Sequence, residues 1–211
     1  RKSEALSVSL TQLILNAQNE NGSWDGEFLS PITGFAHGGS GISATLSKVY
    51  SVTKSSLVLH AIENNLTFEK KSFDFKHNVY LDYRYHNTSD QIKSGYLTNA
   101  WCHGAPGIIL ARTISLYHLH NYSLIDKDYL RLIEIVYNTI SKNAVEQLCC
   151  GSAGSALILD LILSLKLPLP EKHKILCEKG VSVFLQEIES KYQLINSKNN
   201  FEDVLSKIEK I

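Results

Sequence analysis

The sequence has no excess of charge of either sign, since 21 Lys and Arg residues balance 21 Asp and Glu residues. Without a basic field to gather phosphates, nucleic acids and anionic membrane surfaces are not expected partners. Long apolar runs are also missing. A stretch such as 156–167 is interrupted by Asp160 and Ser164 and is shorter than the ~20 residues that cross a bilayer. We therefore expect a soluble, cytoplasmic protein without membrane insertion.

Methionine is absent from the sequence, which begins at Arg1, and the first residues lack the cationic and then apolar pattern of a secretory signal. These absences predict an excised or incomplete piece of a longer polypeptide. A hydrophobic content of 44% over 211 residues is sufficient for one hydrophobic core, or for a large part of a bigger one. We therefore expect a folded part of a domain and not a disordered chain.

Cysteine occurs only four times, which leaves disulfides, a metal site or buried thiols as the possible uses. Cys149 and Cys150 are adjacent, and a disulfide between neighbours is strained. Cys102 has the same local sequence surroundings as that pair, so a shared metal ion explains the placement better than disulfides do. Cys177 has no partner nearby in the sequence and is interpreted as structural.

Alternating strand patterns are nearly absent, whereas apolar residues recur at spacings of three and four in several segments. This spacing is typical of amphipathic α-helices that bury one stripe. The clearest segments are 5–17, 55–66, 130–140 and 174–188. Pro168 and Pro170 separate the last of them from the apolar run before it. The sequence therefore predicts an all-α fold.

A short motif occurs three times and aligns without gaps. The copies are Ala36-His37-Gly38-Gly39-Ser40-Gly41-Ile42, Cys102-His103-Gly104-Ala105-Pro106-Gly107-Ile108 and Cys149-Cys150-Gly151-Ser152-Ala153-Gly154-Ser155, and an apolar helical run follows each. The distances between copies leave room for one outer helix and a return loop. Each copy is interpreted as a tight turn that opens an inner helix, with glycines that allow close approach of neighbouring helices. We therefore expect an array of helical hairpins whose inner helices converge at their N-terminal ends.

Three cysteine sulfurs from these turns make a plausible zinc site. Catalytic zinc usually keeps three protein ligands and an open fourth position, and Cys102, Cys149 and Cys150 supply three thiolates. Three thiolates leave the ion with a net charge of about −1, which makes it a poor activator of water. Such an ion is better suited to keeping a fourth thiol nucleophilic, so the pattern favours thiol activation over hydrolysis.

Two histidines are candidates for the acid/base role that such chemistry needs. His37 occupies the equivalent helix-start position in the first copy of the motif, and imidazole titrates near neutrality. His103 is adjacent to a proposed ligand and could support the metal or donate a proton. The chemistry alone does not separate the two.

Simpler interpretations apply to most of these residues when they are taken singly. A Cys-Cys pair before glycine is often just two small residues at a close helix contact. Because the motif is repeated, a shared metal site becomes the favoured interpretation. Asp25 lies in a glycine-flanked loop and could reach a pocket. Asp82 and Arg84 are interpreted as a local salt bridge or surface pair. The charged run 69–76 is interpreted as a solvated face.

The three motifs together resemble the successive signatures of LanC-like cyclases. The matching words are Gly34-Phe35-Ala36-His37-Gly38 with Gly41-Ile42, Trp101-Cys102-His103-Gly104-Ala105-Pro106-Gly107-Ile108, and Cys149-Cys150-Gly151 with Gly154. The order and spacing agree as well, and the resemblance covers roughly residues 24–163. It implies a partial α/α toroid, a double-layered helical barrel, with zinc bound by Cys102, Cys149 and Cys150 and an acid/base role for His37.

The resemblance also implies an activity and partners. LanC-like cyclases add cysteine thiols to dehydroalanine or dehydrobutyrine and so close the thioether rings of lanthipeptides (lantibiotics). Cys150 stands where stand-alone members usually carry histidine, which is similar to the C-terminal cyclase domain of class II lanthipeptide synthetases. The expected partners are then a dehydrated precursor peptide and an N-terminal dehydratase domain of the same parent chain.

Some family features have no counterpart in the sequence. The upstream Gly-rich motif with its aspartate does not occur in residues 1–33, and Thr98 stands where some stand-alone cyclases carry an arginine. Residues 1–211 are therefore predicted to be the C-terminal part of a single cyclase domain. Two alternatives stay open: a protein that adds glutathione to dehydrated residues, and a non-catalytic, zinc-stabilised helical fragment.

Overall fold

The structure, a computed structural model, describes residues 2–26, 31–81, 100–142 and 147–198. These residues are almost entirely α-helical, as the sequence predicts, with one antiparallel pair of two-residue strands. The elements in chain order are α1 (Lys2–Asn16), α2 (Gly39–Thr53), α3 (Ser56–Lys71), β1 (Phe73–Asp74), β2 (Val79–Tyr80), α5 (Ala105–Leu119), the 3₁₀ turn Tyr122–Leu124, α6 (Lys127–Lys142), α7 (Ser152–Ser164) and α8 (Glu171–Lys198).

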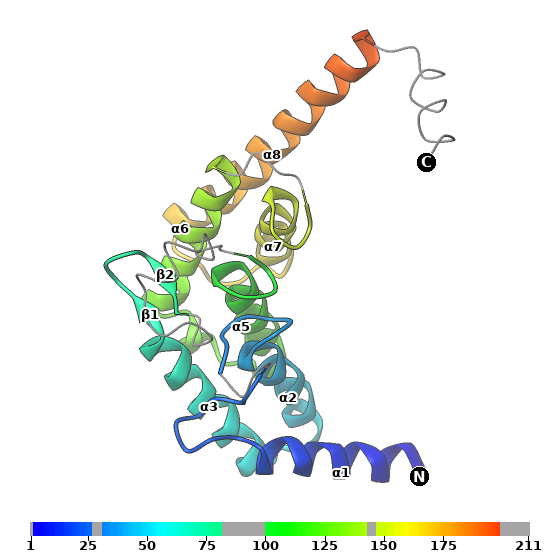
Figure 1. Cartoon of the computed structure of the whole chain (residues 1–211), viewed down its shortest axis with the longest axis vertical. Helices are drawn as coiled ribbons and strands as arrows, with labels where there is room; N and C mark the ends of the chain where they lie inside the picture. Colours follow the sequence, from blue (N-terminus) through cyan, green and yellow to red (C-terminus); the bar gives the residue numbers. More distant parts are fainter. Residues whose placement is uncertain (1, 27–30, 82–99, 143–146, 199–211) are drawn as a thin grey trace.

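The helices form two layers (Figure 1). The inner layer consists of α2, α5 and α7, each of which begins directly after one copy of the glycine motif, and α5 packs against both of the others. In the outer layer, α3 packs on α2, whereas α6 packs on α5 and α7, and α8 packs on α6 and α7. This arrangement is the array of helical hairpins that the repeat predicts.

All four predicted amphipathic helices are present, as α1, α3, α6 and α8. Most of them run further than predicted, and α3 extends to Lys71. The interpretation of 69–76 as a solvated face is wrong at its first residue, because Glu69 on α3 is only 3% exposed. A buried carboxylate requires a partner, and Arg112 of α5 supplies it across the layers.

The core has two parts. The larger lies among α5, α6, α7 and α8 and includes the fully buried side chains of Ile108, Leu132 and Leu159. Cys177 of α8 is also buried there, away from the other cysteines. The smaller part lies between α2, α3 and the loop after α1, where the Trp24 indole N–H donates to the Ile14 carbonyl at 2.8 Å. Two adjoining cores thus hold the inner helices side by side.

The ends of the molecule differ from its centre. α8 extends well past the packed layers, and α1 lies across the opposite end (Figure 1). No helix among the described residues has both the length and the apolar character needed to span a membrane. The N-terminal ends of the inner helices, which carry the glycine motifs, lie between these two ends of the molecule (Figure 1).

Candidate metal centre

The three glycine motifs share an N-cap glycine and one close backbone contact, which makes the sequence repeat a structural one. Gly38, Gly104 and Gly151 cap the N-termini of α2, α5 and α7. Within the first turn of each helix a second glycine lies under the carbonyl group of the residue six positions earlier. A Cβ atom at that glycine would overlap the carbonyl oxygen; the pairs are Gly41 with Phe35, Gly107 with Trp101, and Gly154 with Leu148. We call the segments 34–38, 101–104 and 148–151 turn 1, turn 2 and turn 3.

Backbone hydrogen bonds join the turns to one another. From turn 1, the N–H groups of Phe35 and His37 donate to the carbonyls of Trp101 and Cys102 in turn 2, each at 3.3 Å. From turn 2, the N–H of Trp101 donates to the Cys149 carbonyl of turn 3 at 2.8 Å. The Phe35 and Trp101 rings also stack, with 5.4 Å between their centroids. The turns therefore form a continuous strip of backbone across the inner helices.

Gly34 shows why turn 1 can approach turn 2 so closely. Its φ angle is +115°, in the left-handed region that favours glycine. A Cβ atom on Gly34 would overlap the α-carbon of His103. Only a residue without a side chain allows this approach, which sets His37 beside Cys102 along the strip.

The three cysteines of turns 2 and 3 form one cluster. The Sγ atoms of Cys102, Cys149 and Cys150 all lie within 4.8 Å of one another. In a tetrahedral zinc–thiolate site with bonds of about 2.3 Å, the sulfurs lie about 3.8 Å apart, so small side-chain movements would bring these three into bonding distance. Cys102 is buried whereas Cys150 is exposed, which leaves the cluster accessible from the turn 3 side. The donor set and its spacing fit a single thiophilic ion.

Electrostatics make this cluster a poor place for three thiolates without a cation. Burial, together with the neighbouring sulfurs of Cys149 and Cys150, raises the pKa of the Cys102 thiol to about 12. Burial also raises the pKa of Cys150. A divalent cation among the sulfurs would reverse both effects, because it stabilises the deprotonated form.

The two predicted histidines take different positions at the centre. His103 places its Nδ1 atom 3.3 Å from the Cys102 sulfur, in contact with the cluster. The His37 side chain is exposed and lines an open pocket of about 430 Å³. Asp25 and Trp101 line the same pocket, so Asp25 does reach a pocket from its loop. His103 therefore contacts the sulfur cluster, whereas His37 faces an open pocket that polar and apolar residues line.

Trp101 also lines a second pocket. This pocket has a volume of about 440 Å³ and is lined by apolar side chains of α5 and α7, with Cys149 at its edge. The apolar members are Leu110, Leu148, Leu157, Ile158 and Leu161. The sulfur cluster thus has an apolar pocket beside it, and Trp101 lines both this pocket and the His37 pocket.

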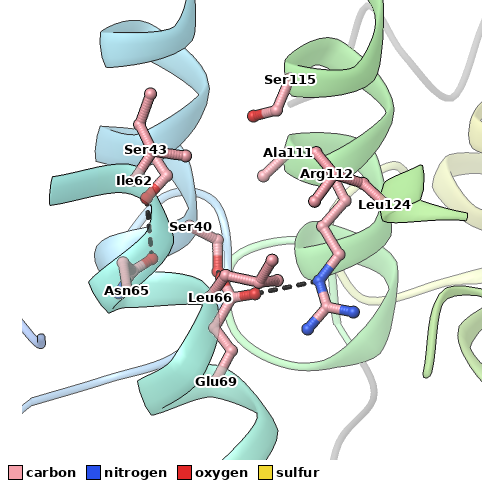
Figure 2. A pocket seen from close by; sticks show the side chains of 10 residues that line it. All are labelled: Ser40, Ser43, Ile62, Asn65, Leu66, Glu69, Ala111, Arg112, Ser115 and Leu124. Atoms are coloured by element: carbon pink, nitrogen blue, oxygen red, sulfur yellow. Dashed lines mark hydrogen bonds and ion pairs between the residues drawn. The ribbon is translucent and has the colours of Figure 1, made fainter. Parts of the chain in front are cut away.

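A buried polar network beneath turn 1 has no clear signal in the sequence. Glu69 of α3 accepts a hydrogen bond from Nε of Arg112 on α5 at 3.1 Å and another from the Ser40 hydroxyl on α2 (Figure 2). Burial lowers the pKa of Arg112, but the charge and hydrogen bond of Glu69, together with nearby Tyr80 and Asp126, outweigh it, so this pKa lies above its ordinary value. The predicted Asp82–Arg84 pair lies outside the described residues.

The two helical layers, the three glycine turns and the clustered sulfurs define a protein that forms part of a helical toroid with a cluster of cysteine thiols at its centre. The chain belongs to the lanthionine synthetase C-like protein family, whose model matches residues 4–206. The match extends the resemblance beyond residues 24–163 to both flanks. No similar sequence is found among curated proteins.

A solved structure supports the fold assignment. The chain is similar to nisin cyclase, with 19% sequence identity and a TM-score of 0.65 over 95% of the chain. The matched part makes up 53% of that protein, so the chain spans about half the length of nisin cyclase. The predictions of an all-α, LanC-like toroid fragment and of the family are thereby confirmed.

Proposed function

We propose that the chain is the zinc-binding portion of a lanthionine cyclase. In the proposed reaction, a cysteine thiol of a dehydrated precursor peptide adds to a dehydroalanine or dehydrobutyrine of the same peptide. The observation that carries this proposal is the placement of three cysteine sulfurs within 4.8 Å on two hydrogen-bonded glycine turns. Membership of the lanthionine synthetase C-like family supports it.

The sulfurs of Cys102, Cys149 and Cys150 would hold the ion. When bound, zinc with three thiolates supplies a coordination position at which a fourth thiol loses its proton and stays nucleophilic. Exposure of Cys150 gives a peptide access to this position. An apolar pocket lies beside Cys149.

The remaining step is a proton transfer that the chain's own residues perform. Attack of the sulfur on the β-carbon forms a C–S bond, and the C=C electron pair moves to the α-carbon and its carbonyl as an enolate. His37, whose exposed imidazole lines one pocket with Trp101 of turn 2, delivers to the α-carbon a proton that replaces the one released by the thiol. His103 contacts the Cys102 sulfur and orients it.

The three proposed cysteine ligands also support a proposal about the class of the parent enzyme. Three cysteines without a histidine ligand favour a domain like the C-terminal cyclase of class II synthetases, with a dehydratase domain preceding it. The proposed substrate is then a precursor peptide dehydrated by the same polypeptide.

A thiol-counting assay tests the proposal. The full-length natural protein, loaded with zinc, is incubated with a peptide that carries one dehydroalanine and one cysteine. Ring closure leaves the peptide mass unchanged, so the product is treated with iodoacetamide and unreacted thiols are counted by mass spectrometry. We expect the alkylated fraction to fall with zinc and not after chelation. Equal ring formation by protein shown to be free of zinc would contradict the proposal.

The same assay separates the two alternatives. With glutathione added, a glutathione-transferring protein would yield a peptide heavier by one glutathione, whereas a cyclase gives the ring. A non-catalytic zinc fragment would give neither product while still binding zinc in a 1:1 ratio by elemental analysis. Either result would replace the cyclase assignment.

A further inference from the structure

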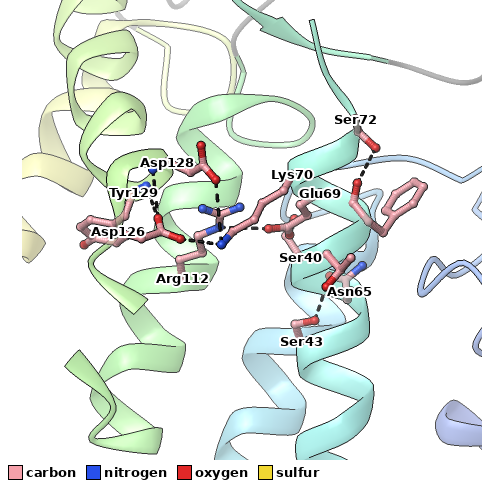
Figure 3. Close-up of polar contacts among 12 residues, drawn as sticks. Ser40, Ser43, Asn65, Glu69, Lys70, Ser72, Arg112, Asp126, Asp128 and Tyr129 are labelled. Atoms are coloured by element: carbon pink, nitrogen blue, oxygen red, sulfur yellow. Dashed lines mark hydrogen bonds and ion pairs between the residues drawn. The ribbon is translucent and has the colours of Figure 1, made fainter. Parts of the chain in front are cut away.

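The Glu69 carboxylate joins three helices at one buried point. It belongs to α3 in the outer layer, and it faces Ser40 at the start of α2 and Arg112 in α5 (Figures 2 and 3). Glu69 and Arg112 are 3% and 6% exposed, and Ser40 is fully buried. A carboxylate in this position ties the two inner helices to each other through the outer layer.

Ser40 extends this contact to turn 1. Its hydroxyl donates to Oε1 of Glu69 and accepts the backbone N–H of Gly34 at 3.2 Å. Gly34 begins the segment that carries His37, and its α-carbon lies against His103 in turn 2. A hydrogen-bonded path therefore runs from Arg112, in the helix that turn 2 opens, through Glu69 and Ser40 to the backbone of turn 1.

Stability alone is a weak explanation for this path. The two terminal nitrogens of Arg112 are buried and have no hydrogen-bond partner among the residues that the structure describes. Desolvation of a guanidinium that is satisfied only at Nε offsets much of the attraction to Glu69, and buried ion pairs are often no more stabilising than apolar residues of similar size. Charge pairs of this kind are better suited to holding one fixed arrangement of the elements they join.

We propose that Ser40, Glu69 and Arg112 are positioning residues that hold turn 1, and with it His37, in register with the sulfur cluster on turn 2. The inference rests on the proposed cyclase function, in which His37 acts on a substrate held at the cluster. A shift of turn 1 by a fraction of an ångström would leave the three sulfurs in place and move the proton donor. Loss of the path therefore lowers the rate of the chemical step and leaves metal binding unchanged.

Ser43 offers a matched control for Ser40. It lies one helical turn further along α2, is also buried, and donates its hydroxyl to Oδ1 of Asn65 at 2.9 Å (Figure 3). Ser40→Ala and Ser43→Ala therefore each remove one buried hydroxyl and one hydrogen bond to α3. Only Ser40 bonds to turn 1, so any difference between the variants reports on positioning and not on general loss of stability.

Both variants are made in the full-length, zinc-loaded protein and assayed with the dehydroalanine peptide. We expect Ser40→Ala to lower kcat about tenfold with KM nearly unchanged, because small misplacements of catalytic groups have large rate effects. Ser43→Ala should retain kcat within about twofold and show a similar decrease in melting temperature. In cobalt-substituted protein, the thiolate-to-metal absorption band should be the same in both variants and in the unmodified protein.

Three results would overturn the inference. Equal kcat values for the two serine variants would remove the positioning role, as would a kcat loss that merely follows the melting temperature. A changed cobalt band in Ser40→Ala would place the effect on the metal and not on turn 1. Failure of the proposed function is distinguishable, because the unmodified protein itself would then form no ring.

Discussion

Turns 1 and 3 flank turn 2 with the same backbone fold but are held to it in different ways. Turn 1 is joined by several backbone hydrogen bonds, the Phe35–Trp101 stack and the Ser40 path. Turn 3 is joined by the Trp101–Cys149 backbone bond, and its Leu148 side chain is 64% exposed. The protein itself therefore positions the proposed proton donor, whereas a bound ion would complete the attachment of turn 3.

The largest expected effect comes from breaking the link between turns 2 and 3. Cys149→Ala removes one of three ligands, and we expect loss of stoichiometric zinc and a decrease in ring formation of at least about 1,000-fold. Elemental analysis and the thiol-counting assay measure both. Cys177→Ala is the control, since this buried thiol lies in the core away from the cluster and should leave zinc content unchanged. Full zinc in Cys149→Ala would contradict the proposed ligand set.

The next effect concerns the side chain that turn 1 carries. His37→Asn removes the proposed proton donor, and we expect ring formation to slow by about 100-fold with zinc content unchanged. His60→Asn is the control, because His60 is exposed on α3 and lines neither the His37 pocket nor the apolar pocket beside Cys149. If His37→Asn cyclises at the normal rate while His103→Asn does not, the proton role belongs to His103.

Glycine-to-alanine substitutions should show whether turn 1 is held more tightly to turn 2 than turn 3 is. A Cβ at Gly107 would overlap the Trp101 carbonyl and lie 2.7 Å from the Phe35 nitrogen, so two turns would have to move. At Gly154 the overlap is with Leu148, whose exposed segment can shift more easily. We expect Gly107→Ala to lower the free energy of unfolding by about 3 kcal/mol and Gly154→Ala by about 1 kcal/mol. Urea denaturation measures both, and equal losses would mean that turn 3 is as tightly held as turn 1.

The smallest effect is expected for the outer layer. Lys70 of α3 pairs with Asp126, just before α6, at 2.5 Å, and both side chains are about one-third exposed (Figure 3). Exposed pairs contribute about 0.5 kcal/mol, so Lys70→Ala should scarcely change the denaturation midpoint, zinc content or kcat. A tenfold lower kcat would show that this surface pair, and not only the buried Glu69, helps to align the turns.

The sequence predicted the features that depend on short windows. Helices such as 130–140 follow from apolar spacing, and the glycine turns follow from a motif repeated in one register. The helix ends differ from the predicted boundaries, because helix ends depend on packing as well as on the local sequence. The adjacency of Cys149 and Cys150, with Cys102 in a matching turn, was enough to predict that these cysteines would meet, and their sulfurs do lie together.

The buried charged residues beneath turn 1 were not predicted from the sequence. Glu69 lies in a charged run that reads as a solvated face, and its partner Arg112 is 43 positions away along the chain. Nothing local marks either as buried, because an ion pair between layers forms only when α3 and α5 are brought to packing distance. Amino-acid order alone thus determined the helices, the turns and the family. Tertiary packing decided which charges are buried and how turn 1 is held, since side chains distant in the chain meet only when the core closes.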